Sequence, residues 1–285
     1  MSASPQRPAD TRPPPYEPVI TSLQNPKIKR AVKLRKRACR DEEGLLIIEG
    51  YRELKRALEN DHTPLDLFYC ADLFQGENEP ALIEQCRAAG ATITNCTAEV
   101  FGKMAYRDRP EGLLALAPQI GGSLADLSLP PDPLLLIAER IEKPGNLGTM
   151  LRSADAAGVD AVLVCDHCTD INNPNVVRAS IGTLFTLPVV EASSRETRRW
   201  LTENRIQAVA ATPHTDTRHT DIDYRRGTAI LVGAEQYGLS DFWMDAADAH
   251  VRIPMQGQCD SLNVAAAATI LLFEAVRQRV PASDA

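Results

Sequence analysis

The sequence predicts an α/β protein made of two units, each with a sheet covered by helices. Short apolar runs alternate with amphipathic stretches from residue 21 onward, which is the pattern of strands followed by helices. A stretch rich in glycine and proline interrupts this alternation at residues 119–132. The apolar runs beyond it are continuous, as in parallel strands buried on both faces. We therefore expect a smaller unit at residues 21–118 and a larger one at 133–285.

The residues before and between the two units are poor in apolar side chains. Residues 1–20 hold six prolines and cannot bury enough surface to order themselves, so we expect a disordered leader there. The segment from Gly121-Gly122-Ser123 to the prolines at 130, 131 and 133 is expected to be a linker.

The smaller unit is expected to open with a helix from Pro26 to Cys39, because proline is favoured in a first helical turn and the apolar residues recur at helical spacing. A continuous apolar run then marks a buried strand at Gly44–Glu49. The other expected elements are a helix at Tyr51–Glu59 and strands at Leu65–Cys70, Thr92–Cys96 and Gly112–Ala117.

Six short apolar runs predict the strands of the larger unit. They lie at Leu134–Ala138, Ala161–Cys165, Pro188–Glu191, Gln207–Ala211, Ala229–Gly233 and His250–Ile253. The last expected element is a long helix at Leu262–Arg279. Its apolar residues exceed what one buried face needs, which favours a second contact surface.

Bulk composition narrows the class of protein without indicating a function. A chain of 285 residues with 44% hydrophobic and 24% charged residues is typical of a soluble globular protein. No apolar stretch approaches the roughly 20 residues that cross a bilayer, and the N-terminus lacks the apolar core of a secretory signal. Seven irregularly spaced cysteines suit reduced thiols. We expect a cytoplasmic protein without a membrane partner.

One segment departs from the acidic average of the chain, whose net charge of −7 by itself disfavours a nucleic-acid partner. Residues 27–40 contain no acidic side chain. Their cations are Lys27, Lys29, Arg30, Lys33, Arg35, Lys36, Arg37 and Arg40. On a helix these side chains would form a positive face, which either stays solvated or binds phosphates by releasing counterions. The segment indicates a polyanion partner and does not separate RNA from DNA.

Three segments of the larger unit place polar residues directly after expected strands. The first is Lys143-Pro144-Gly145-Asn146-Leu147-Gly148, with Arg152 in the helix that follows. The second is Gly233-Ala234-Glu235-Gln236-Tyr237-Gly238, a glycine-flanked turn with a lone acid. The third runs from Ile253 through Asp260-Ser261-Leu262-Asn263 into the final helix. Each has a plain structural explanation by itself, such as a helix cap, a surface arginine or a strand-to-helix turn.

Together, the three segments resemble the three motifs of the SpoU (TrmH-like) branch of the SPOUT methyltransferases, in the same order and at similar spacing. The larger unit resembles that catalytic domain over its full length. The smaller unit resembles the ribosomal-protein-like RNA-binding domain that often precedes it. The residues that carry this second likeness are Thr21-Ser22-Leu23-Gln24-Asn25-Pro26-Lys27-Ile28-Lys29 and Ile48-Glu49-Gly50.

The resemblance implies a Rossmann-like parallel sheet with a C-terminal trefoil knot, an obligate homodimer, and S-adenosylmethionine (AdoMet) as cofactor. The polar active-site residues that it implies are Asn146, Arg152, Glu235, Ser261 and Asn263. The residues implied to line the cofactor pocket, mostly through backbone atoms, are Thr212, Gly233, Ile253 and Leu262. RNA contacts are expected from Lys27, Lys29, Arg30, Lys33, Lys36 and Arg178.

The implied reaction is methyl transfer to a ribose 2'-hydroxyl, which is a poor nucleophile and must lose a proton. A guanidinium stays protonated at ordinary pH, so Arg152 is better suited to grip the phosphate beside the ribose and stabilise developing negative charge than to act as a base. The RNA phosphate or Glu235 would then accept the proton. Alignment of the reacting atoms would lower the barrier further, and no metal is needed.

The resemblance makes an RNA 2'-O-methyltransferase the leading hypothesis. A separate docking domain favours large-subunit ribosomal RNA over tRNA, because such a domain suits a folded hairpin within a large RNA. A tRNA methyltransferase and a catalytically silent RNA-binding or ribosome-assembly factor of the same fold remain alternatives. A nicotinamide-dependent oxidoreductase is disfavoured, since no G-x-G-x-x-G follows an early strand.

Several suggestive residues are expected to be structural. Cys165-Asp166-His167-Cys168 has no second half-site at zinc spacing, so we expect no metal there. His214 and His219 lie in a polar loop and are expected to be solvated. Trp200 and Trp243 sit beside apolar residues at helical positions and are expected in the core.

Overall fold

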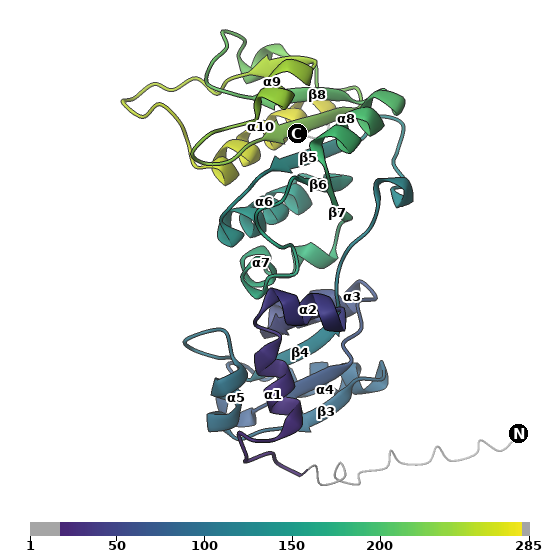
Figure 1. Cartoon of the computed structure of the whole chain (residues 1–285), viewed down its shortest axis with the longest axis vertical. Helices are drawn as coiled ribbons and strands as arrows, with labels where there is room; N and C mark the ends of the chain where they lie inside the picture. Colours follow the sequence, from purple (N-terminus) through teal and green to yellow (C-terminus); the bar gives the residue numbers. More distant parts are fainter. Residues whose placement is uncertain (1–17, 281–285) are drawn as a thin grey trace, which may run out of the picture.

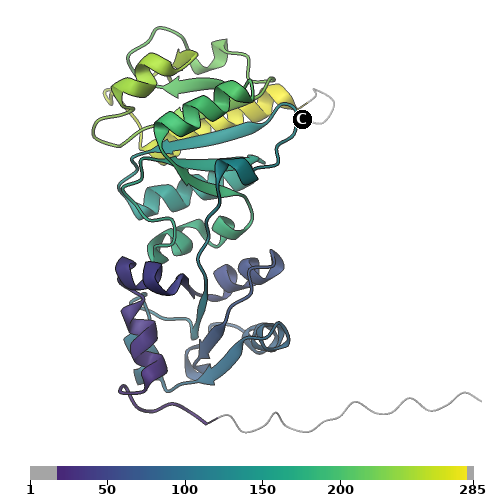
Figure 2. The same ribbon diagram turned by 45° about the vertical axis from the view of Figure 1, so that its right-hand side comes forward.

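The computed structural model describes residues 18–280 (Figure 1). The expected disordered leader, residues 1–20, therefore falls outside the described residues as far as residue 17. Ile20 already belongs to the fold, because its N–H donates to the Asn95 carbonyl at 2.8 Å. Figures 1 and 2 show an elongated molecule in which the two units are stacked end to end.

The first unit is a four-stranded mixed sheet with the order β1-β4-β2-β3. Its elements are α1 (Pro26–Lys33), α2 (Arg37–Glu43), β1 (Leu45–Glu49), α3 (Tyr51–Glu59), β2 (Asp66–Tyr69), α4 (Glu79–Ala88), β3 (Thr92–Asn95), α5 (Ala98–Met104) and β4 (Leu113–Pro118). Strand β4 pairs antiparallel with β1 and with β2, and β2 pairs parallel with β3. Alternate residues of β1 enter two separate apolar clusters, so the sheet is covered on both faces.

The expected single helix at Pro26–Cys39 is wrong, because the chain breaks there into α1 and α2. Leu34 is the C-cap of α1 and lies fully buried, and α2 starts at Arg37. At the break, two backbone carbonyls need hydrogen-bond donors. The Arg40 guanidinium provides them, because its Nη1 donates to the carbonyls of Leu34 at 2.9 Å and of Arg35 at 3.0 Å. A side chain from the next helix thus replaces the backbone hydrogen bonds that a continuous helix would have made.

The second unit is a six-stranded, all-parallel sheet with the order β10-β8-β9-β5-β6-β7. Its elements are β5 (Leu134–Glu139), α6 (Pro144–Ala156), β6 (Ala161–Cys165), α7 (Pro174–Ser180), β7 (Val189–Ala192), α8 (Ser194–Glu203), β8 (Gln207–Ala211), β9 (Thr228–Val232), α9 (Asp241–Ala246), β10 (Ala249–Val251) and α10 (Val264–Arg279). The expected strands all exist, with ends within two residues. Helices α6 and α10 pack on one face, whereas Leu201 of α8 and Trp243 of α9 join the cluster on the other.

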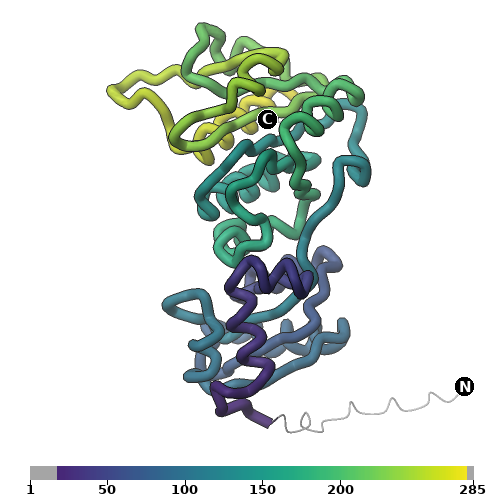
Figure 3. The backbone as a smooth tube through the Cα atoms, viewed as in Figure 1, coloured from purple at the N-terminus to yellow at the C-terminus, as the bar shows by residue number. Residues whose placement is uncertain are grey.

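Buried polar contacts join the two units. The Arg40 guanidinium forms an ion pair with Asp170 of the second unit, and the two side chains are only 2% and 9% exposed. The Asn172 side chain accepts from the Ile120 N–H at 2.8 Å and donates to the Ile120 carbonyl at 2.9 Å. His62 stacks on Phe185 with ring centroids 5.0 Å apart. Figure 3 shows the linker ascending along one side of the molecule before it enters the second unit.

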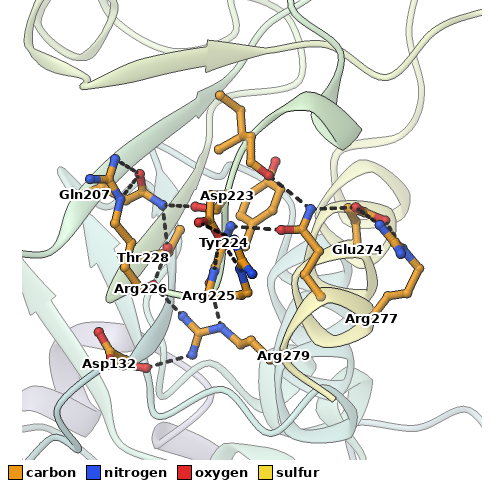
Figure 4. Close-up of polar contacts among 12 residues, drawn as sticks. Asp132, Gln207, Asp223, Tyr224, Arg225, Arg226, Thr228, Glu274, Arg277 and Arg279 are labelled. Atoms are coloured by element: carbon orange, nitrogen blue, oxygen red, sulfur yellow. Dashed lines mark hydrogen bonds and ion pairs between the residues drawn. The ribbon is translucent and has the colours of Figure 1, made fainter. Parts of the chain in front are cut away.

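The end of α10 is anchored to the backbone of the loop that precedes β9 (Figure 4). Arg279 donates to the carbonyl oxygens of Tyr224, Arg226, Asp132 and Pro133 at 2.7–3.1 Å. Gln278 adds a hydrogen bond from its Nε2 to the Ile222 carbonyl and accepts one from the Tyr224 N–H. One helical turn therefore holds together segments from three parts of the second unit.

Candidate functional site

A glycine of the first motif lets α6 and α7 pack closely. A Cβ on Gly148 would lie 2.5 Å from the Ala179 side chain and 2.8 Å from the Ser180 nitrogen. Any larger residue would force the two helices apart. The glycine therefore brings the motif on α6 against the segment that carries Arg178.

The three motifs meet in a short chain of hydrogen bonds between side chains. Asn263 Nδ2 donates to Asn146 Oδ1 at 3.2 Å, and Asn146 Nδ2 donates in turn to Glu235 Oε1. Asn146 lies in the first turn of α6, Glu235 follows β9, and Asn263 is the N-cap of α10. Residues separated by 89 and 117 positions thus form one polar cluster, which we call the Asn-Asn-Glu chain.

The Asn-Asn-Glu chain leaves one carboxylate oxygen of Glu235 available to a ligand. Glu235 Oε2 is buried and has no hydrogen-bond partner in the described part of the protein. A buried acceptor without a donor costs about 1–3 kcal/mol, so it is a natural place for a ligand hydroxyl or N–H to bind. Because Asn146 fixes the other oxygen, the free one points in a defined direction.

Ser261 does not take part in the Asn-Asn-Glu chain. It is exposed, and its Oγ donates only to Asp260 Oδ1 at 3.3 Å. The cap of the final helix is Asn263, whose side chain accepts from the Ala265 N–H at 3.0 Å. The helix starts two residues later than expected because Asn263 provides this cap.

Arg152 also lies outside the Asn-Asn-Glu chain. It is exposed, on α6, six residues beyond Asn146, and makes no hydrogen bond or ion pair to another described residue. Its neighbour Ser153 contacts Thr269 of α10, with 2.6 Å between the hydroxyl oxygens. Arg152 therefore borders the outer surface of the α6–α10 pair.

The residues expected around the cofactor follow the carboxyl ends of three adjacent strands. Thr212 follows β8, Gly233 follows β9, and Ile253 lies two residues beyond β10. Parallel strands end at the same edge of their sheet, so these positions share one edge. Ile253 is half-buried, and Leu262 is 41% exposed. Backbone groups at strand ends, with apolar side chains still uncovered beside them, fit a ligand that has both polar and aromatic parts.

Gly233 has a structural reason to be glycine besides any ligand. A Cβ there would lie 2.2 Å from the carbonyl carbon and oxygen of Gly238. The two ends of the Glu235 loop touch at this point, where Ala234 and Gly238 form a β-bridge. The backbone of Gly233 is thus approached by Gly238, at the other end of the same loop.

A buried carboxylate that sequence reasoning missed holds the same loop. Glu139, the last residue of β5, is 1% exposed. It accepts from the Ser240 N–H at 2.8 Å and the Ser240 hydroxyl at 2.6 Å. Ser194, which also accepts from Trp243 Nε1 at 2.9 Å, adds a weaker contact at 3.3 Å. An acid at the end of an otherwise apolar strand was the available signal.

Most of the expected RNA-binding cations are free and exposed. The side chains of Lys27, Lys29, Lys33, Lys36 and Arg178 are exposed, and none of them forms an ion pair with a residue in the range 18–280. Arg30 differs, because it is paired with Glu43 at 2.5 Å and with Asp66 at 3.3 Å. Arg35 binds the Ala105 carbonyl and lies over the Tyr106 ring, so it is structural, like Arg40.

The residues expected to be structural are placed as follows. Trp243 is fully buried, Trp200 packs partly buried beside the same cluster, and His214 is exposed. His219 is half-buried. Burial raises the pKa of the Cys165 thiol to about 12, which makes it a poor metal ligand at neutral pH. Within residues 18–280, no cluster of three or more His, Cys, Asp or Glu is arranged to hold a metal.

Comparison with known sequences agrees with this arrangement. The profile of the SpoU rRNA Methylase family matches residues 133–273, and that of the MRM3-like substrate binding domain matches residues 25–115. A 23S rRNA (uridine(2479)-2'-O)-methyltransferase of Streptomyces viridochromogenes is 32% identical over 243 residues, which cover 83% of this chain and 84% of that protein. The chain belongs to the SpoU rRNA methylase family.

Solved structures of RNA methyltransferases share the fold over most of the chain. An RNA 2'-O ribose methyltransferase is 41% identical with a TM-score of 0.80, over 91% of this chain and 98% of that one. An AdoMet-bound rRNA methyltransferase from Sinorhizobium meliloti is 30% identical with a TM-score of 0.84, over 93% of this chain and 99% of that one. The family, the methyltransferase class and the cofactor expected from the sequence are confirmed. In the described residues no helix is long and apolar enough to cross a membrane.

Proposed function

We propose that this SpoU-family methyltransferase modifies a ribose 2'-hydroxyl of large-subunit ribosomal RNA, with AdoMet as methyl donor. The observation that carries the proposal is the Asn-Asn-Glu chain, which joins all three motifs and leaves Glu235 Oε2 buried and unpaired. Two further features support the choice of RNA. They are the relative from Streptomyces, named for 23S rRNA and matched over both units, and the unpaired lysines of the first unit.

In the proposed reaction, Glu235, Asn146 and Arg152 have different roles. AdoMet supplies an electrophilic methyl group when bound. Glu235 Oε2 accepts the hydrogen bond of the ribose hydroxyl and then its proton, while Asn146 holds the other oxygen in place. Arg152 binds the phosphate beside the target ribose and stabilises the developing negative charge. A catalytically silent protein would have no use for an oriented carboxylate beside the cofactor edge.

The proposal also includes the oligomeric state of the protein. Ile270 and Phe273 of α10 are 37% and 45% exposed, and Arg152 is on α6, the helix that packs against α10. A second copy of the chain would cover these apolar side chains and border Arg152, so we propose a homodimer through α10. Light scattering at micromolar concentration should give twice the chain mass. A fully active monomer would contradict it.

The remaining parts of the proposal follow from the family. We propose that the C-terminal part of the second unit is threaded into a trefoil knot, and that the protein works in the cytoplasm on ribosomal RNA. The units proposed are residues 21–118 for substrate binding and 133–285 for methyl transfer, joined by the linker at 119–132. Slow, denaturant-dependent refolding of the isolated second unit would test the knot.

The substrate is tested by mapping 2'-O-methylated positions in total RNA from a deletion strain. Loss of one large-subunit mark, restored by the wild-type gene, is the expected result. Loss of a tRNA mark with intact ribosomal marks would overturn the rRNA assignment. Calorimetry with AdoMet and with NAD should show binding of AdoMet alone, and absence of AdoMet binding at millimolar concentration would defeat the proposal.

The role of Arg152 is tested by Arg152→Ala. The variant should keep its fold, its AdoMet affinity and most of its RNA affinity, and lose turnover by a factor of about a hundred or more. Arg199→Ala, an exposed arginine on α8, is the matched control and should keep full turnover. A near wild-type single-turnover rate for Arg152→Ala would show that the active-site assignment is wrong.

A further inference from the structure

A cleft of about 910 Å³ opens where the two units meet, away from the Asn-Asn-Glu chain. One wall is built by the first unit, from the start of α3 and the loops around residues 75–79 and 107–111. The other wall is Arg178 and Ile181, at the end of α7 in the second unit. Figure 1 shows α7 directly above the helices of the first unit at this junction. The cleft is large enough for more than a single phosphate group.

Three of the arginines that line the cleft are unpaired. Arg52, Arg109 and Arg178 are exposed, and none forms a hydrogen bond or ion pair with another described residue. They come from three different segments, α3, the 107–111 loop and α7, and converge only in the folded chain. Arginine presents a planar fork of donors that suits phosphate oxygens.

Most acidic side chains of the cleft are already engaged. Glu53, 4% exposed, accepts from Arg107 Nη2 at 2.7 Å, and Arg107 also binds Glu111. Glu79 Oε1 accepts from the backbone N–H groups of Gln75 and Gly76 at 3.1 and 2.9 Å. Asp108 is the one exposed acid in the described lining without such a partner. The lining holds four arginines and four acids in all, but among its exposed side chains three arginines face the single carboxylate of Asp108.

The two walls are fixed relative to each other. Arg56 on α3 donates to the Ile181 carbonyl at the end of α7, one turn from Arg52. Because the two walls are already joined, RNA binding in the cleft requires no rearrangement of the two units.

We propose that this cleft is a second RNA site, in which Arg52, Arg109 and Arg178 bind backbone phosphates of the segment between the docked hairpin and the target nucleotide. The inference rests on the proposed function, and it adds a site for which only Arg178 was expected from the sequence. Helix α7 packs on α6, which carries Asn146 and Arg152, so RNA held in the cleft leads from the first unit toward the reacting groups.

The test uses the full chain, with large-subunit rRNA extracted from the deletion strain as probe. The variant Arg52→Ala/Arg109→Ala/Arg178→Ala is compared with Arg199→Ala/Arg205→Ala/Arg225→Ala, which removes the same charge from exposed arginines elsewhere. With about 0.7 units of log K against log salt per phosphate on single-stranded RNA, the cleft variant should lower that slope by up to about 2 units. Its affinity should fall at least tenfold, whereas the control should retain both values.

Two further measurements separate the possible outcomes. AdoMet affinity and the melting temperature should be unchanged in both variants. If the cleft variant matches the control in RNA affinity and salt slope while wild type binds RNA and AdoMet, the inference is wrong and the proposed function stands. If AMP binds the wild-type cleft at micromolar concentration without displacing RNA, the cleft is a small-molecule site and the inference is also wrong. Wild-type protein that binds neither RNA nor AdoMet would overturn the proposed function itself.

Discussion

At the scale of single residues, the candidate site depends on amides that orient a carboxylate. Asn146 uses both ends of its side-chain amide, donating to Glu235 and accepting from Asn263. Since Asn263 also caps α10 through Ala265, rotating any one of these groups disturbs the others. The direction of Glu235 Oε2 is thus set by residues that need never touch substrate.

Glu139→Gln should lower kcat at least tenfold with little change in AdoMet affinity. A glutamine keeps one oxygen for the Ser240 N–H but turns an NH₂ group toward the Ser240 hydroxyl, so both charge-assisted hydrogen bonds of the carboxylate are lost and the Glu235 loop is held less firmly. Single-turnover kinetics and thermal unfolding measure both effects.

The control for Glu139→Gln is Asp160→Asn, because Asp160 accepts from the Leu134 N–H at 2.8 Å, at the opposite end of the same strand. It should cost stability and spare kcat. Equal kcat values for Glu139→Gln and wild type would show that Glu139 has only a structural role.

At the scale of elements, α1 and the turn after it form the proposed RNA-docking surface, and only some of its cations are free to bind phosphate. Arg35 and Arg40 are bound to backbone carbonyls and Asp170, and Arg30 is bound to two carboxylates. The lysines remain exposed and unpaired. The charge that can release counterions from RNA is therefore smaller than the sequence count suggests.

Replacing Lys27, Lys29, Lys33 and Lys36 by alanine should weaken RNA binding and lower the salt slope by up to about one unit for each phosphate that is no longer neutralised. Arg30→Ala should have a smaller effect, because its charge is already paired. AdoMet affinity should not change in either variant. A salt slope equal to that of wild type would remove α1 from the RNA interface.

A second prediction at this scale concerns the end of α10. Burial lowers the pKa of Arg279, and its guanidinium serves four backbone carbonyls (Figure 4). Arg279→Met should lower the free energy of unfolding by about 1.5–3 kcal/mol, since four backbone carbonyls, two of them in partly buried hydrogen bonds, lose a charged donor. Arg225→Met removes only an exposed pair with Asp223 and should cost about 0–1 kcal/mol. Urea unfolding compares the two, and equal destabilisation would contradict the anchoring role.

At the scale of the whole molecule, the buried Arg40–Asp170 pair makes the docking surface and the catalytic unit one body. The same guanidinium ends α1 and reaches the second unit, so the direction of the basic helix is coupled to the position of the site. An RNA docked on α1 is thereby held at a fixed distance from the reacting groups.

Asp170→Asn should destabilise the protein by about 3–5 kcal/mol, because it leaves the Arg40 charge buried without compensation. Asp41→Asn, which breaks an exposed pair with Arg37, should cost about 0–1 kcal/mol. Thermal and urea unfolding of the full chain measure both. If Asp170→Asn unfolds like wild type, the pair does not hold the units together.

The sequence by itself predicted the strands and the positions that form the Asn-Asn-Glu chain. Continuous apolar runs such as Ala161–Cys165 coincide with the observed strands, because a strand covered on both faces admits hardly any polar side chains. The motif positions also followed from the sequence, since Asn146, Glu235 and Asn263 each follow a strand, and parallel strands bring such positions to one edge.

Tertiary structure alone decided which groups touch. The break at Leu34, the burial of Arg40 and the pairing of Arg30 depend on partners such as Asp170 and Glu43, whose distance in space no local pattern encodes. The same holds for Glu139. In the sequence it is one polar residue at the end of a strand, and only the folded structure shows its hydrogen bonds with Ser240. Periodicity reports which face of an element is buried, whereas hydrogen bonds and ion pairs between distant elements form only when packing has fixed both partners.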